Sequence, residues 1–245
     1  MLARCGVVPN HQRPKAVIFD VDGTLVDSNA AHARSWRDVL AEAGQRVSYE
    51  RIRHMIGMGG DKILPALTGI TADSEAGRQM ARRRLEIFRL DYLPYLQPFP
   101  ATRALALRLR EDGVRLLVAT SASGEVVDRL LEIAEVRDLI DDSAAKGDAG
   151  HTKPDPDIVR AALARAAESP DRVLMIGDTP YDIEAADRTG IRTLALRCGG
   201  GWSEQDLAGA VAIFDDPLDL LFDYDDSPLV GRGEWAPVAV RTRAR

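Results

Sequence analysis

Short, uninterrupted apolar runs that alternate with amphipathic segments most limit how this chain can fold. Apolar runs of this length are typical of strands that are buried on both faces of a sheet. Strict alternation of strand and helix predicts right-handed crossovers, and therefore an α/β fold with a doubly wound parallel sheet. The expected strands are residues 16–19, 116–119, 173–176, 194–196 and 211–214.

In the segments between these runs, apolar residues recur at the spacing that is typical of helices with one buried face. Ala101, Leu105 and Leu109 recur at intervals of four residues, and the pattern stops near Gly113. Apolar residues four apart lie on the same face of a helix. The helices expected around the sheet are residues 101–111, 126–134, 158–167 and 217–222.

One long segment, from about residue 29 to residue 95, contains no convincing strand. Its helical stretches are residues 30–43, 49–55, 62–67 and 74–92, and three prolines within 94–100 predict a stiff return linker. We therefore expect an α-helical cap at 29–95, inserted into a core formed by 15–28 and 96–226. Residues 1–14 would be an N-terminal extension, and 227–245, which mix Pro, Gly and Arg without periodicity, a flexible tail.

Composition narrows the class of protein. The 245 residues carry a formal net charge of −6, which disfavours a nucleic-acid partner. No stretch approaches the roughly 20 apolar residues that span a membrane, and residues 1–14 lack the apolar run of a secretory signal. Cys5 and Cys198 cannot form a disulfide framework. These features predict a cytoplasmic protein with reduced thiols; the simplest expectation for assembly is a monomer or weak dimer.

Carboxylates follow two of the expected strands. Asp20 and Asp22 come directly after strand 16–19, and Asp178 and Asp182 follow strand 173–176. Open parallel sheets place ligand sites at the carboxyl ends of their strands. Taken alone, a DxDG sequence is also common in turns and calcium loops, and Asp178 or Asp182 could simply cap the helix that begins near Pro180.

Two further segments supply groups that can bind an anion. Thr120 and Ser121 follow strand 116–119, and Lys153 precedes the helix expected at 158–167. Thr120 could instead be an N-cap residue and Lys153 a solvated surface lysine. The conjunction of four such segments, each after a strand or before a helix, favours one shared crevice.

The chemistry of this set fits phosphoryl transfer. Close carboxylates repel each other unless a cation holds them, and hard oxygen ligands suit Mg²⁺. A phosphoryl group adds negative charge, which Mg²⁺, a lysine and hydrogen-bond donors would neutralise. One carboxylate can act as the nucleophile and a second can carry the proton.

With these motifs in the observed order, the sequence resembles the haloacid dehalogenase superfamily, and within it the phosphatase branch with a helical cap. The similarity covers roughly residues 15 to 222. It implies a Rossmann-like core and a small phosphorylated metabolite as substrate. The motifs that carry the resemblance are Asp20-Val21-Asp22-Gly23-Thr24, Thr120, Lys153-Pro154 and Gly177-Asp178-Thr179 with Asp182.

The resemblance also implies roles for the acidic residues. Asp20 would be the nucleophile and a metal ligand. Asp22 would be the general acid and base, and its main-chain carbonyl would bind the metal. Asp178 would complete the protein contacts to Mg²⁺, and Asp182 would orient ligands or waters around the ion without binding it. An aspartyl-phosphate would be the intermediate.

The remaining motif residues would hold the phosphoryl group. Thr120 and Lys153 would bind its oxygens, and the main-chain N–H groups near Ser121 would add donors. In the cap, His32 resembles a histidine that orients the acid/base aspartate in the β-phosphoglucomutase branch. Lys62 is the cap cation nearest the glycine loop 57–60 and could contact substrate. The run 82–84 of three arginines reads as the solvated face of a long helix.

Three alternatives can be weighed by residue. Dehalogenases do not need the second aspartate and phosphonatases usually lack it, so Asp22 disfavours both. A β-phosphoglucomutase-like phosphosugar mutase is the main rival, but residues 56–62 contain no arginine for a distal phosphate, and Gly177 stands where a glutamate is common. A non-enzymatic phospho-acceptor domain would be about half this length and would lack the cap. The pattern favours a phosphatase similar to phosphoglycolate phosphatases, while sugar phosphates and nucleoside monophosphates stay open as substrates.

Overall fold

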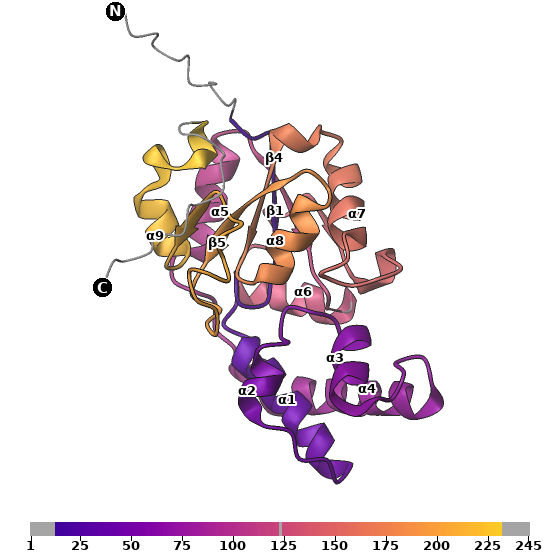
Figure 1. Ribbon diagram of the computed structural model, residues 1–245. Coiled ribbons are helices and arrows are strands. Elements are labelled where there is room, and N and C mark those ends of the chain that lie inside the picture. Colours follow the sequence, from indigo (N-terminus) through magenta and orange to yellow (C-terminus); the bar gives the residue numbers. More distant parts are fainter. Residues whose placement is uncertain (1–12, 123, 232–245) are drawn as a thin grey trace, which may run out of the picture.

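A six-stranded parallel sheet forms the centre of the molecule in the computed structural model, which describes residues 13–122 and 124–231 (Figure 1). The strand order is β3-β2-β1-β4-β5-β6, and every neighbouring pair is parallel. The order reverses at β1, which is where doubly wound sheets open a crevice. The strands are β1 (Ala16–Phe19), β2 (Arg115–Ala119), β3 (Asp142–Ala144), β4 (Val173–Gly177), β5 (Arg192–Leu196) and β6 (Ala212–Phe214).

The sheet confirms the predicted doubly wound fold, with one strand that the sequence analysis missed. Strand β3 has only three residues and lies at the edge of the sheet, where it pairs with β2 from Leu117 opposite Asp142. Only Ala144 of this strand is buried. A short edge strand with one buried residue does not require a run of apolar residues. The hydrophobic pattern of the sequence therefore gives no sign of this strand.

Helices cover both faces of the sheet. Helices α5 (Thr102–Glu111), α6 (Gly124–Ile133) and α9 (Pro217–Phe222) contribute to the cluster on one face. Helices α7 (Asp157–Ala166) and α8 (Pro180–Asp187) pack with the opposite faces of β1, β2 and β4. Shorter 3₁₀ turns are Leu93–Tyr95, Lys146–Asp148, Pro170–Arg172, Tyr224–Asp226 and Pro228–Val230.

The chain between β1 and α5 is helical and lies at the carboxyl ends of the strands (Figure 1). Its helices are α1 (Asn29–Glu42), α2 (Tyr49–Arg53), α3 (Gly60–Thr68) and α4 (Glu75–Ile87), which continues into a π-helical turn at Phe88–Tyr92. They bury an apolar cluster of their own, which includes Trp36, Leu40, Ile52, Ile63 and Leu64. We refer to residues 29–95 as the cap, as the sequence analysis predicted it.

The chain leaves and re-enters the core along one paired ribbon. Val26 and Pro98 form an antiparallel bridge. The N–H of Asp27 donates to Gln97 O at 3.0 Å, and the N–H of Phe99 donates to Leu25 O at 3.1 Å. The outgoing and returning segments therefore support each other by main-chain hydrogen bonds.

The first residues of the expected flexible tail are instead part of the fold. Ser227 Oγ accepts a hydrogen bond from the N–H of Leu229 at 3.2 Å, and Leu229 is fully buried in the main core cluster. Leu229 is the buried apolar residue of this turn. One such residue produces no periodic pattern, so the hydrophobic pattern of the sequence could not reveal it. The other residues of the tail, and residues 1–12 of the N-terminal extension, lie outside the described residues. No helix in the described ranges is both long and apolar enough to cross a membrane.

Candidate active site

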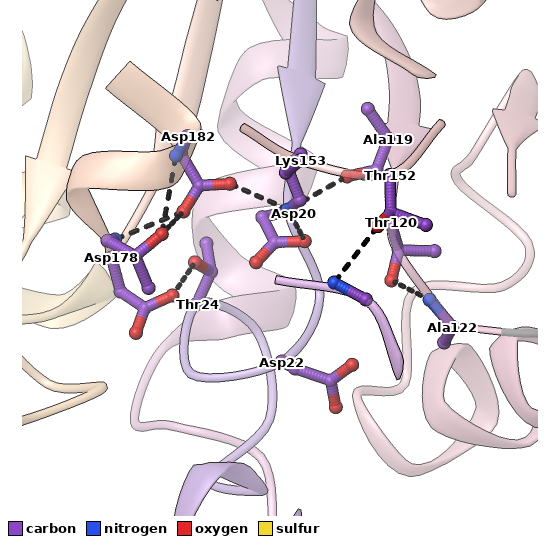
Figure 2. Close-up of polar contacts among 12 residues, drawn as sticks. Asp20, Asp22, Thr24, Ala119, Thr120, Ala122, Thr152, Lys153, Asp178 and Asp182 are labelled. Atoms are coloured by element: carbon purple, nitrogen blue, oxygen red, sulfur yellow. Dashed lines mark hydrogen bonds and ion pairs between the residues drawn. The ribbon is translucent and has the colours of Figure 1, made fainter. Parts of the chain in front are cut away.

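Four loops from the carboxyl edge of the sheet meet at one place (Figure 2). Asp20 follows β1, Thr120 follows β2 and Asp178 follows β4, and the sheet order places these strand ends side by side. Lys153 arrives from the loop before α7. The convergence that the motif order predicted is present in the structure.

Lys153 is the centre of this group. Its ammonium lies 2.6 Å from Asp20 Oδ1 and 2.6 Å from Asp182 Oδ1, and only 1% of the residue is exposed. Burial by itself would lower the pKa of Lys153, but Asp182 and Asp20 outweigh it and hold that pKa above its ordinary value. The alternative of a solvated surface lysine is therefore wrong.

Asp182 is saturated by donors from the chain. Its Oδ1 accepts from Lys153, and its Oδ2 accepts from Thr179 N at 3.0 Å and Thr179 Oγ1 at 2.7 Å. The bond from Thr179 N, together with the reciprocal bond from Asp182 N to Thr179 Oγ1 at 3.3 Å, makes the capping box of α8, in which Pro180 occupies the first turn. Asp182 thus caps the helix and also fixes the lysine that holds Asp20.

The negative charges of Asp178 and Asp20 are only partly offset by the hydrogen bonds and ion pairs of the described residues. Asp178 accepts from Thr24 Oγ1 at 3.3 Å and from Asn29 Nδ2 at 2.7 Å. Burial, Asp182 and Asp20 raise the pKa of Asp178 well above its ordinary value. Burial likewise raises the pKa of Asp20 to about 7, with Lys153 lowering it and Asp182 and Asp22 adding to the rise.

The donor set fits a hard divalent cation. Carboxylate oxygens of Asp20, Asp178 and Asp182 all lie within 4.8 Å of one another, and the three residues are buried. A cation would stabilise the ionised forms of Asp20 and Asp178, whose pKa values are raised without one. Asp182 has three donors, one of which is the Lys153 ammonium, whereas the two donors to Asp178 are neutral groups. Asp178, together with Asp20, is therefore better suited than Asp182 to bind a cation such as Mg²⁺.

The carboxylate of Asp22 lies apart from the lysine cluster and faces the cap (Figure 2). Its Oδ1 is 2.7 Å from His32 Nε2 and accepts from Ser28 Oγ at 2.5 Å. Burial would raise the pKa of Asp22, but His32, Ser28 and Arg84 outweigh it and hold that pKa below its ordinary value. Asp22 is therefore an ionised acceptor in this state.

His32 is held as a donor to Asp22 by its second partner. Arg84 donates from Nη2 to His32 Nδ1. A guanidinium has no acceptor, so Nδ1 must accept and the ring proton must reside on Nε2. Burial, with the positive charges of Arg84 and Arg53, lowers the pKa of His32, and its ring stacks on Phe88 at a centroid distance of 4.1 Å.

A cavity of about 270 Å³ lies between the core and the cap. Its core side contains Asp20, Asp22, Thr120, Ser121 and Lys153, which are five of the predicted catalytic and phosphate-binding residues. Ser121 Oγ is buried and has no hydrogen-bond partner among residues 13–122 and 124–231, so this hydroxyl is available to a bound group. Thr120 Oγ1 accepts from the N–H of Ala122 at 3.1 Å, which leaves its own proton to donate.

The cap side of the cavity is largely apolar with a few cations. Trp36, Ile56, Met58 and Ile63 supply apolar surface. Its cations are Arg82 and Arg84 of α4, while Lys146, from the 3₁₀ turn after β3, lines the cavity from the core.

Two predictions about cap residues need correction. Lys62 does not line this cavity, because its ammonium pairs with Asp155 at 2.6 Å on the loop that carries Lys153. Arg84 is not a solvated residue, because it lies over the rings of Trp36 and Phe88 and reaches His32. Arg84 shares its helical stripe with Phe88, four residues on, and that spacing could have revealed its inward position. Arg82 and Arg83 behave as expected of solvated residues, since both are exposed and pair with exposed glutamates, Arg82 with Glu75 and Arg83 with Glu42 and Glu86.

The fold and site together define a doubly wound α/β protein with a buried carboxylate-lysine centre at the switch point of the sheet. Comparison with known proteins takes this further. A family model described as haloacid dehalogenase-like hydrolase matches residues 17–196. The chain belongs to this family and is thus an enzyme of the hydrolase class, as the motifs predicted.

Individual relatives agree with this membership. The chain is 32% identical to the phosphoglycolate phosphatase of Rhodospirillum rubrum, over 83% of this chain and 88% of the relative. It is 26% identical to a fructose-1-phosphate phosphatase of Escherichia coli, over 76% and 98% of the two chains. Among solved structures, a hydrolase from Pseudomonas syringae is 28% identical with a TM-score of 0.80, covering 86% of this chain and 98% of that one. A putative β-phosphoglucomutase from Bacteroides vulgatus, 24% identical with a TM-score of 0.77 and 89% coverage of both chains, shares the fold.

Proposed function

We propose that the protein is a Mg²⁺-dependent phosphatase that hydrolyses small phosphomonoesters through an aspartyl-phosphate on Asp20. The observation that carries this proposal is the position of Asp20. Its carboxylate is fixed by Lys153 and lies on the wall of the cavity between core and cap, which Asp22, Thr120 and Ser121 also line. A buried, oriented carboxylate beside a cation site is suited to in-line attack on phosphorus.

The residues around Asp20 would bind the phosphoryl group and the metal ion. Lys153 and the hydroxyls of Thr120 and Ser121 would bind the phosphoryl oxygens. Mg²⁺, held by Asp20, Asp178 and the main-chain carbonyl of Asp22, would supply charge neutralisation. Asp182 would keep Lys153 in place, since it shares the lysine ammonium with Asp20.

Asp22 would act on both halves of the reaction. It would donate a proton to the leaving alkoxide in the first step and take one from water in the second. The ionised state favoured by His32 and Ser28 is the one needed for the second step. A bound phosphoryl dianion near Asp22 would raise its pKa and so favour the protonated state needed for the first.

The cavity favours a compact substrate with a second acidic group. About 270 Å³ is enough for a small metabolite, and Arg82, Arg84 and Lys146 add positive charge to the lining. Phosphoglycolate, which carries a carboxylate beside its phosphate, fits this description, and relatives named phosphoglycolate phosphatase support it. We further propose that the enzyme works in the cytoplasm as a monomer or weak dimer, without a nucleic-acid partner.

A phosphosugar mutase is the second candidate, favoured by one observation. An arginine of the cap, Arg84, does reach the cavity, although from α4 and not from the loop 56–62. Its guanidinium is engaged by His32, so it is less suited to hold a distal phosphate. A mutase would interconvert sugar phosphates, whereas a phosphatase would release inorganic phosphate.

One experiment tests both candidates. Purified protein would be incubated with a panel of phosphate esters, with and without Mg²⁺, and both released phosphate and sugar-phosphate isomers would be measured. We expect Mg²⁺-dependent phosphate release that is lost in Asp20→Asn, with the variant still folded by circular dichroism. Near-normal turnover in Asp20→Asn would overturn the mechanism, and isomerisation without phosphate release would favour the mutase.

A further inference from the structure

A cap arginine crosses to the core on the side opposite the lysine loop. Arg53, the last residue of α2, donates from Nη2 to the main-chain oxygens of Gly199 and Gly200, the latter at 2.9 Å. Both glycines belong to the loop that follows β5. A single guanidinium nitrogen thus joins the cap to this loop.

The same loop lies directly on the carboxylate of Asp178. Asn29 Nδ2 donates to Gly199 O at 3.2 Å and to Asp178 Oδ2 at 2.7 Å. Gly199 is packed so closely that an added Cβ would fall 1.7 Å from Asp178 Oδ2. The carbonyl that Arg53 binds is therefore also a support for the amide that orients Asp178.

Aromatic packing closes the rest of this junction. Tyr181 donates from its hydroxyl to His54 O at 2.7 Å. The ring of Trp202 meets His54 of the cap and Tyr181 of the core edge-on, each at a centroid distance of 5.5 Å. Arg53 Nη1 is buried there and has no hydrogen-bond partner in the described part of the chain, so the guanidinium is committed to this interface and not to solvent.

We propose that Arg53 is a positioning residue that couples the closed cap to the metal affinity of Asp178 through Gly199 O. This inference rests on the proposed Mg²⁺ site. Without Arg53, Gly199 O keeps only Asn29 as a hydrogen-bond donor among the described residues and the loop loses its tie to the cap, so the orientation of Asn29 and Asp178 loosens. Because coupling between two equilibria is reciprocal, Mg²⁺ binding in turn stabilises the Arg53 junction.

The chain offers a matched control for this coupling. Lys62 also joins the cap to the core, through Asp155, and neither residue contacts Gly199 or Asp178 in the hydrogen bonds and ion pairs of the described residues. Lys62→Met therefore removes a cap–core ion pair without touching the loop over Asp178. Arg53→Met removes the donors of Arg53 and keeps much of its apolar stem, and Arg53→Lys keeps a charge and one donor group.

The test is calorimetric titration of Mg²⁺ into the full substrate-free chain and its three variants. Contacts that orient a metal ligand typically change affinity by about 10–100-fold. Since Arg53 acts through one further residue, we expect about tenfold weaker binding for Arg53→Met. Arg53→Lys should lie between that variant and the wild type, and Lys62→Met should stay within about twofold. Amide exchange at residues 53–58 should slow with Mg²⁺ in the wild type and not in Arg53→Met.

The outcomes separate this inference from the proposed function. Unchanged Mg²⁺ affinity in a folded Arg53→Met, or an equal loss in Lys62→Met, would overturn the coupling and leave the phosphatase proposal intact. Absence of Mg²⁺ binding in the wild type would overturn the metal site and the coupling together. If Arg53→Met does not fold, an unchanged affinity in Arg53→Lys would also count against the proposal.

Discussion

His32 of the cap and Asp22 of the core are joined by a hydrogen bond of 2.7 Å in which the imidazole Nε2 is the donor. The proposed acid/base is thus oriented by a residue that the cap supplies. Ser28, the core residue that precedes α1, donates to the same oxygen of Asp22 at 2.5 Å. This arrangement leads to the first of four predictions.

Replacing Asp22 by Asn should remove proton transfer and leave the metal site in place. Positioned acid–base groups typically contribute about 10²–10⁴ in rate, so kcat should fall by that range. An ester with a good leaving group needs no proton in the first step, and it should therefore accumulate phosphoenzyme on Asp20. Rapid quench with mass spectrometry of the intact protein measures this. Equal losses for good and poor leaving groups, with no phosphoenzyme, would contradict the role of Asp22.

Arg84→Met should raise the pKa of His32. Burial remains in this variant, but the positive charge that opposes imidazolium formation is gone. A protonated His32 needs a partner for both ring nitrogens, so the orientation of Asp22 changes as the histidine titrates. The acid limb of the kcat profile should therefore move to higher pH. NMR titration of the His32 ring protons measures the shift directly; a pKa at or below that of the wild type would contradict the argument.

Lys153→Met should destabilise the protein as well as inactivate it. The ammonium is the shared partner of Asp20 and Asp182, and removal of one member of a buried ion pair typically costs about 3–5 kcal/mol. Adding Asp182→Asn should recover part of that loss, since the unpaired buried charge is then gone. Urea unfolding of the single and double variants checks this. Additive losses would mean that the lysine and the aspartate act independently.

The metal-free protein should lose stability as the pH rises through the range in which Asp20 ionises. Its pKa is raised from 3.8 to about 7, mainly by burial, so the folded state holds this proton more tightly than the unfolded state. The contribution of Asp20 is present below about pH 4 and is lost as the pH approaches 7. Thermal unfolding in a chelator should show this loss, and Mg²⁺ should reverse it.

Asp20→Asn is the control for that prediction, because an amide does not titrate. The difference in Tm between wild type and variant should therefore change with pH between about 4 and 7 in the chelator. A difference that is constant with pH would show that Asp20 has the same pKa in the folded and unfolded states, which would contradict the prediction.

Much of the fold could be predicted because its signals are local. Strand β1 and helix α9 were predicted with the bounds that the structure has, since each is a complete apolar run or a capped turn. The convergence of Asp20, Thr120, Lys153 and Asp178 follows from parallel strands that end at one edge. Motif order was enough for that part of the site.

The contacts between the cap and the core could not be predicted, because they depend on how these two parts of the fold are oriented toward each other. The sequence analysis placed Lys62 near the substrate and Arg84 in solvent, whereas Lys62 pairs with Asp155 and Arg84 reaches the cavity and His32. Each position depends on which side of a cap helix meets the core. Asp155 and His32, the residues that receive them, are far away in sequence and carry no signal of the pairing. Arg53 gave no signal either, since its partners are main-chain oxygens of glycines.

The ribbon that pairs Val26 with Pro98 places the junction between core and cap beside Asp22, the proposed acid/base. Ser28 lies two residues from that bridge and His32 one helical turn further, while Asp22 belongs to the turn that the ribbon leaves. A rotation of α1 about this junction would withdraw His32 from the Asp22 carboxylate and open the cavity between core and cap at the same time. Proton transfer by Asp22 and access of water would then change together.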